Sequence, residues 1–221
     1  MKGSLAGGWD VAASVCLLLS SCAMASEGSG PRLVQPGAPG EPSRVLSAEE
    51  SELAPPVLVT TADVRFMQGM IAHHAQALTV SRFVPSRAEG EGVRLLAERI
   101  ERSQGDEMAL MERWLAARGE EIPDPTVGYQ IQSSGGQPVL MPGMLTADEL
   151  AELEEASAAD FDRLFLVYMI RHHEGALTMV RELFASAGAG EEGVIFEFAV
   201  DVDSDQRIEI ARMVRMLTGS P

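Results

Sequence analysis

Apolar residues recur at three- and four-residue steps in the segment after residue 60, which places them on one face of an α-helix. The alternation of apolar and polar positions that is typical of a half-buried strand is absent there. The pattern predicts a helix from Thr61 or Ala62 to near Phe83, ending before Pro85. Its apolar stripe consists of Phe66, Met67, Met70, His74, Ala77 and Leu78.

This segment occurs a second time in the chain. Residues 70–74 read MIAHH, residues 169–173 read MIRHH, and the match extends to both sides. A match of this length indicates an internal repeat. The other equivalent pairs are Asp63 and Asp162, Phe66 and Phe165, Ala77 and Ala176, Leu78 and Leu177, and Thr79 and Thr178.

A weaker match follows each copy at a slightly larger spacing. A longer turn between the helices of the second copy explains the change, and the glycine-rich stretch 188–193 supplies one. The repeated unit is therefore predicted to be a helical hairpin. The weaker match pairs Gln104, Glu107, Met108, Met111 and Leu115 with Gln206, Glu209, Ile210, Met213 and Leu217.

Capping signals predict the other helix boundaries. Ser86 with Glu89 predicts the start of a helix that closes near Gly119. Thr146 with Glu149 predicts a short helix that leads into the long helix of the second histidine pair. A last helix is expected over roughly 191–217.

Two such hairpins can bury their apolar faces only against each other. The predicted fold is therefore all-α, a ferritin-like four-helix bundle built from two repeated helical hairpins. It is expected to cover residues 59–221, with the repeats at about 60–119 and 146–219.

The first 22 residues read as an export signal, with Lys2 before an apolar run that is too short to span a bilayer. Residues 19–22, LSSC, resemble the lipobox of bacterial lipoproteins. This predicts acylation of Cys22 and anchoring to a cell-envelope membrane. The alternative is a secreted or periplasmic soluble protein, cleaved at the small-x-small sequence 23–25.

Residues 23–58 are rich in Gly, Pro and Ser without apolar periodicity, so they are predicted to form a flexible tether. The chain has 33 acidic and 17 basic residues and a formal charge of -16, which disfavours nucleic acid as a partner. Both cysteines, Cys16 and Cys22, lie in the leader region, so no disulfide is expected in the helical domain.

All four histidines of the chain fall in the repeated pairs, His73 with His74 and His172 with His173. Adjacent residues on a helix are about 100° apart, so one ring of each pair is expected to point inward, with His74 and His173 favoured. Soft sulfur beside nitrogen suits Cu(I). Met70 and Met169 stand one turn before the histidines on the same face, and they either supply this sulfur or only fill gaps in the core.

Other residues are weaker candidates for the same site. Exposure is the default expectation for Glu107 and Glu209; if they and Gln104 and Gln206 face inward, they could bind metal or orient the histidines. In the MPGML segment, Met141 and Met144 are either soft ligands or a hydrophobic plug. Core packing is expected for Met108, Met111 and Met213, and helix capping for Asp63 and Asp162.

The blocks M-I-x-H-H-x-x-A-L, M-P-G-M-L and F-D-R-L-F-L resemble the domain of unknown function 305 family over about residues 60–217. The resemblance implies a ferritin-like fold, export and, as in some members, copper or silver binding. The motif residues that it highlights are Met70, His73, His74, Met141, Met144, Met169, His172 and His173.

Three hypotheses for function follow. The first is an exported copper-binding lipoprotein that buffers or hands on the metal. The second, a ferritin-like di-metal oxidoreductase, is disfavoured because Met70 and Met169 occupy the glutamate positions of the Glu-x-x-His pattern. The third is a metal-free envelope interaction module. No catalytic residue is predicted, and the sequence indicates neither a protein partner nor an oligomeric state.

Overall fold

The computed structural model describes residues 34–35, 42–47, 49–50, 57–124, 130–132 and 138–219. The chain divides into two compact units, 1–55 and 56–221. In the first, β1 (Val34–Gln35) pairs with the antiparallel strand β2 (Arg44–Val45), with Val34 opposite Val45. The predicted leader and its lipobox cysteine, Cys22, lie outside the described residues.

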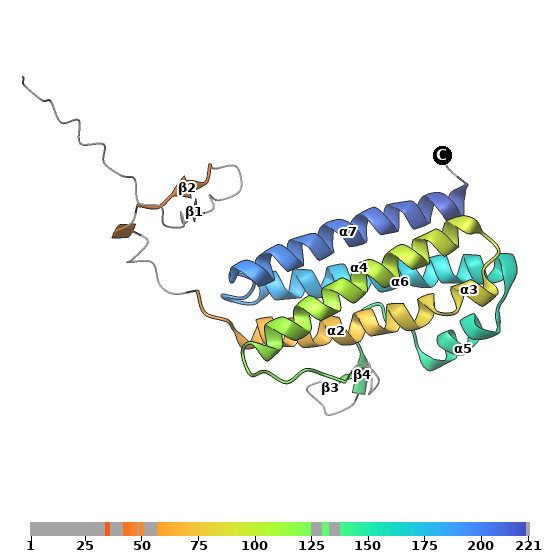
Figure 1. The fold of residues 1–221 in the computed structure, drawn as a ribbon, viewed down its shortest axis with the longest axis horizontal. Helices are drawn as coiled ribbons and strands as arrows, with labels where there is room; N and C mark the ends of the chain where they lie inside the picture. Colours follow the sequence, from red (N-terminus) through yellow and green to blue (C-terminus); the bar gives the residue numbers. More distant parts are fainter. Residues whose placement is uncertain are drawn as a thin grey trace, which may run out of the picture. The chain divides into compact units, whose positions relative to one another are not determined.

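The second unit is all-helical apart from one short antiparallel pair, β3 (Gln130–Gln132) and β4 (Pro138–Leu140), which confirms the all-α class (Figure 1). No helix within the described ranges is long and apolar enough to cross a membrane. The helices are α2 (Thr61–Ser81), α3 (Val84–Arg87), α4 (Glu91–Ala116), α5 (Ala147–Glu155), α6 (Ala158–Ala185) and α7 (Gly193–Thr218).

The two predicted hairpins are present. Helix α2 packs against α4, α6 packs against α7, and the contact between α2 and α6 joins the hairpins (Figure 1). Each of two core clusters draws on all four of these helices. Full burial of one large apolar side chain stabilises the fold by about 1.5–3 kcal/mol. The largest fully buried side chains include Met67, Ile71, Leu96, Ile100, Met111, Leu115, Phe161 and Phe165.

One predicted helix start is wrong. Ser86 does not open the second long helix; it lies in α3, because Pro85 is tolerated in the first turn of a helix. Helix α4 begins later, after Gly90. The carboxylate of Asp162, from the other repeat, accepts hydrogen bonds from the N–H groups of Glu89 (3.2 Å) and Gly90 (2.7 Å) at this start.

The other capping predictions hold. Thr146 and Glu149 form a reciprocal capping box at α5, and Thr60 forms one with Asp63 at α2. The prediction of a longer turn in the second copy is wrong: the second copy has a longer first helix instead, because α6 continues to Ala185 whereas the repeat equivalent of Ser81, the last residue of α2, is Val180. The turn between α6 and α7, residues 186–192, is shorter than the segment 82–90 that joins α2 to α4 and contains α3. Gly188 and Gly190 adopt φ values of 73° and 71° in this turn, a conformation that glycine adopts without strain.

Candidate metal centre

All four histidines are buried, with at most 1% of each residue exposed. His73 on α2 and His172 on α6 face each other, with ring centroids 3.9 Å apart and ring planes at 35°. The repeat therefore brings its two histidine pairs together at the contact between the hairpins. Both rings of each pair are buried, and the rings that face each other across this contact are those of His73 and His172, not of His74 and His173, which the sequence favours as the inward pair.

His74 and His173 each bond to a glutamate on the other helix of their own hairpin. His74 Nε2 lies 2.6 Å from Glu107 Oε2 on α4, and His173 Nε2 lies 2.8 Å from Glu209 Oε2 on α7. Glu209 is buried and the Glu107 side chain is 18% exposed. The default expectation of exposed glutamates is therefore wrong, because helix pairing turns both carboxylates toward the histidines.

The two glutamates differ in their remaining partners. Glu209 Oε1 also accepts a hydrogen bond from Arg99 Nε at 3.2 Å. No ion pair among the described residues gives Glu107 a guanidinium partner. The carboxyl group of Asp205 lies in this region, and its pKa is raised by burial and by the negative charge of Glu107. The repeat is therefore symmetric in its histidines and asymmetric in the charge around them.

A backbone group that the sequence does not point to reaches the site. Pro142, in the loop before α5, places its carbonyl oxygen 3.0 Å from His73 Nε2. The approach requires glycine on both sides, because a Cβ on Gly175 of α6 would lie 1.9 Å from that oxygen. Gly143 has a φ of 76°, and a Cβ there would lie 2.3 Å from the carbonyl oxygen of Arg171.

The repeat equivalent of Gly175 holds the same loop in a different way. Gln76, on α2, is buried and exchanges two hydrogen bonds with the backbone of Leu145, at 2.7 and 3.0 Å. The signal for this loop contact in the sequence is the departure from the repeat at positions 76 and 175, one of three differences between the blocks 70–79 and 169–178. Gln76 anchors the loop through its side chain, whereas Gly175, which has no side chain, leaves room for the loop backbone.

The predicted methionines are all buried. Met70, Met141 and Met144 belong to one core cluster, together with Met67 of the predicted apolar stripe and Met179. Met169 lies in the other cluster. Met111 and Met213 are fully buried, and Met108 is partly buried against the first cluster. The thioethers therefore line the core around the histidine helices rather than the surface.

An unusual number of buried polar atoms in this region lack a hydrogen-bond partner. Five of them are ring nitrogens: Nδ1 of His73, His74 and His173, and both nitrogens of His172. Others belong to Gln104, at both amide atoms, and to Gln206, at Oε1. A buried group that loses its partner typically costs about 1–3 kcal/mol, so a cluster of them calls for a ligand or a functional reason.

The environment of His73 and His172 favours neutral rings. Burial, followed by the neighbouring His74, lowers the pKa of His73 to about 3, although the Pro142 hydrogen bond acts in the opposite direction. Burial and then His73 and His173 lower the pKa of His172 well below its usual value. Neutral imidazole is the form that binds metal ions.

The kinds of side chain available as ligands limit which metal ion could bind here. Within the described parts of the chain, no three His, Cys, Asp or Glu side chains converge as a cation site. A site here would therefore combine imidazole nitrogen with another donor type, and the buried thioethers of α2 and α6 are available.

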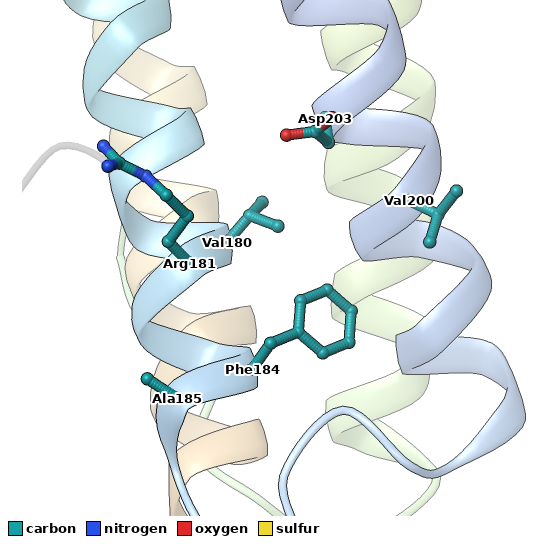
Figure 2. A pocket seen from close by; sticks show the side chains of 6 residues that line it. All are labelled: Val180, Arg181, Phe184, Ala185, Val200 and Asp203. Carbon is teal, nitrogen blue, oxygen red and sulfur yellow. The ribbon is translucent and has the colours of Figure 1, made fainter. Parts of the chain in front are cut away.

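A surface pocket of about 470 Å³ lies elsewhere, between α6 and α7 (Figure 2). Arg181 there donates to Thr178, and Asp203 pairs with Arg207. No histidine lines this pocket, so it is separate from the metal centre. Its lining residues are Val180, Arg181, Phe184, Ala185, Val200 and Asp203.

Paired helical hairpins with buried histidines and methionines between them define a class of helical protein with a nitrogen- and sulfur-lined core. The chain belongs to the DUF305 family, described as a domain of unknown function, whose model matches residues 63–217. No curated protein matches the chain.

Solved structures share this fold. A DUF305 fragment from Deinococcus radiodurans is 32% identical, with a TM-score of 0.61, 74% of this chain covered and 99% of that one. A DUF305 protein from Streptomyces coelicolor, assigned as secreted, is 27% identical, with a TM-score of 0.61 and coverages of 72% and 93%. CopM in its Cu(II)-bound form is 25% identical, with a TM-score of 0.56 and coverages of 71% and 96%.

Proposed function

We propose that this protein is an exported copper-binding protein with a ferritin-like four-helix bundle, which buffers or hands on copper outside the cytoplasm. The ligands are drawn from His73, His74, His172 and His173, with Met70 and Met169. The observation that carries the proposal is the group of five buried imidazole nitrogens without a hydrogen-bond partner.

The chemistry of the donors supports copper. Imidazole combined with thioether suits Cu(I), whereas Zn(II), Mn(II) and Fe(II) gain little from soft sulfur. Glu107 and Glu209 accept hydrogen bonds from ring nitrogens, which leaves them less suited to bridge two iron ions as in a di-iron oxidoreductase. CopM, at 25% identity, is a copper-bound relative in fold.

The envelope location rests on separate support. The lipobox at 19–22 and the tether 23–58 would hold the domain on a membrane through acylated Cys22. The secreted assignment of the Streptomyces coelicolor relative agrees with export. Outside the cytoplasm a glutathione-rich thiol pool would not compete for Cu(I).

The test is a competition titration of the full-length protein with Cu(I) under reducing conditions and with Zn(II) in parallel. The parent should bind Cu(I) much more tightly than Zn(II). The double variants His74→Ala with His173→Ala, and His73→Ala with His172→Ala, should each weaken Cu(I) binding beyond the roughly 10–100-fold effect of losing an outer hydrogen-bond partner. Parental affinity in both folded double variants, checked by circular dichroism, would reject the proposal.

A further inference from the structure

Three of the four histidines commit the same ring nitrogen to an acceptor. Nε2 of His73 faces the Pro142 carbonyl, and Nε2 of His74 and of His173 faces a glutamate carboxylate. Carbonyl and carboxylate oxygens only accept hydrogen bonds. Each of these Nε2 atoms therefore carries the hydrogen.

In a neutral ring with its hydrogen on Nε2, the lone pair is on Nδ1. The Nδ1 atoms of these three histidines are buried and have no partner. We infer that the Pro142 carbonyl, Glu107 and Glu209 are positioning groups that fix the tautomer of His73, His74 and His173, so that any of these rings that binds the metal does so through Nδ1. This inference rests on the proposed copper site and names its ligand atoms.

The three hydrogen bonds have two structural origins and one common result. Glu107 and Glu209 are equivalent residues of the repeat, whereas Pro142 acts through its backbone and reaches His73 only because Gly175 admits the loop. A packing requirement for histidine gives no reason for the same nitrogen to be left unpaired in all three cases. The use of Nδ1 as the metal-binding atom does give one.

Ligation through Nε2 would carry a clear penalty. The metal would displace the hydrogen bond to Glu209, whose carboxylate is 3% exposed and would retain Arg99 alone among its present partners. Ligation through Nδ1 leaves every existing hydrogen bond in place. His172, with neither ring nitrogen partnered, is the one histidine whose tautomer these groups do not fix.

The first experiment observes the ring protons directly. Long-range ¹H–¹⁵N correlation spectra of the metal-free, full-length protein labelled with [¹⁵N]histidine should show hydrogen on Nε2 for His73, His74 and His173, with assignment by single His→Gln variants. Hydrogen on Nδ1 of any of the three overturns the inference. On addition of silver nitrate as a Cu(I) substitute, the perturbed nitrogens should be Nδ1.

The silver step separates the two proposals. Perturbation at Nε2 of these rings overturns the inference and leaves the proposed metal site intact. A spectrum in which silver perturbs no ring nitrogen overturns both the metal site and the assignment of its ligand atoms, whatever the tautomers of the metal-free protein.

The second experiment removes the acceptor. Glu209→Leu should lower Ag(I) affinity about 10–100-fold and give His173 a mixture of tautomers, whereas Glu209→Gln keeps an acceptor oxygen and should retain the parental tautomer. Glu101→Leu, at an exposed position on α4, is the matched control. If the variant at the buried Glu209 does not fold, Glu107→Leu repeats the test at a partly exposed carboxylate, with the tautomer of His74 as the measured quantity. An unchanged tautomer and affinity in the folded Leu variant overturns the inference.

Discussion

The carboxylate of Asp63 on α2 accepts a hydrogen bond of 2.7 Å from the backbone N–H of Gly190, in the turn between α6 and α7. Its repeat equivalent, Asp162 on α6, accepts one of 2.7 Å from Gly90 at the start of α4. Each repeat therefore holds the hairpin turn of the other. Asp63 also caps its own helix, α2, as predicted, whereas the bonds of Asp162 go to the backbone at the start of α4 and not to the N-terminus of α6, which has no side-chain cap.

We expect Asp63→Ala to lower the free energy of unfolding by about 1–3 kcal/mol, because it leaves the Gly190 N–H buried without a partner and also removes the capping box with Thr60. Asp162→Ala should cost less, since its bond to Gly90 is only partly buried. Urea unfolding monitored by circular dichroism measures both. Two separated transitions in the parent protein would contradict a domain in which the repeats fold as one unit.

The loop that carries Pro142 gives a second prediction. Gly175→Ala places a Cβ 1.9 Å from the Pro142 oxygen, so the backbone must move, and we expect a loss of about 1–3 kcal/mol in the free energy of unfolding. Gly105→Ala, on α4, is the matched control. Nothing lies within 4 Å of its added Cβ, and the change should stabilise the helix by up to about 1 kcal/mol. Equal effects in urea unfolding would show that the loop is not closely packed on α6.

The sequence predicts the elements that follow from local patterns. The repeat, the helical hairpins and the Thr146 capping box are readable because periodicity and capping depend on residues a few positions apart. The start of α4 was misplaced because its capping group, Asp162, comes from the other repeat. A local pattern at Ser86 carries no information about a carboxylate so distant in the chain.

The candidate site also has one part that local sequence patterns predict and another part that depends on the assembled fold. The paired histidines and their methionines are evident from duplicated spacing. Whether Glu107 and Glu209 face the histidines depends on how α4 and α7 are rotated in the assembled domain, which their own helices do not determine. The Pro142 contact is made by a backbone carbonyl, which every residue possesses. The pair Gln76 and Gly175 departs from the repeat, but so do two neighbouring pairs, and the sequence does not show which difference admits a loop.

Acid should destabilise the metal-free protein through its histidines. The pKa of His73 is about 3 in the folded protein, against an ordinary value of 6.5, and that of His172 is also lowered. Below pH 6.5 the unfolded chain takes up protons that the folded chain does not. The free energy of unfolding therefore falls as the pH decreases toward 3, by up to about 1.4 kcal/mol per pH unit for each such ring.

Urea midpoints at pH 7 and pH 5 measure this effect in a range where most carboxylates stay ionised. The variant His73→Gln with His172→Gln should show a flatter dependence on pH than the parent. The same slope in both proteins would mean that these two rings do not control acid stability.

Membrane attachment can be tested at the predicted lipobox. Full-length protein expressed in a bacterium should partition with the membrane fraction, and Cys22→Ser should release or mislocalise it because the acylated thiol is lost. Cys16→Ser, the other cysteine of the leader region, is the control and should leave partitioning unchanged. Membrane association of Cys22→Ser equal to that of the parent would exclude a lipid anchor at this residue.

The role of the methionines is decided by two matched pairs of variants. Met70 and Met169 are fully buried equivalents beside the histidines, and Met111 and Met213 are fully buried equivalents on α4 and α7. Replacement by Leu nearly preserves volume, so each double variant should keep the fold at a cost below about 1.5 kcal/mol per site. Only loss of the first pair removes soft donors from the proposed site.

We therefore expect Met70→Leu with Met169→Leu to weaken Cu(I) binding more than Cu(II) binding, because Cu(II) is a harder ion that gains less from a thioether. Met111→Leu with Met213→Leu should leave both affinities at the parental level. Competition titrations with Cu(I) under reducing conditions, and with Cu(II) in air, give the affinity of each double variant relative to the parent for each ion. If the two double variants bind Cu(I) equally well, Met70 and Met169 serve the core as Met111 and Met213 do, and their thioethers are not ligands.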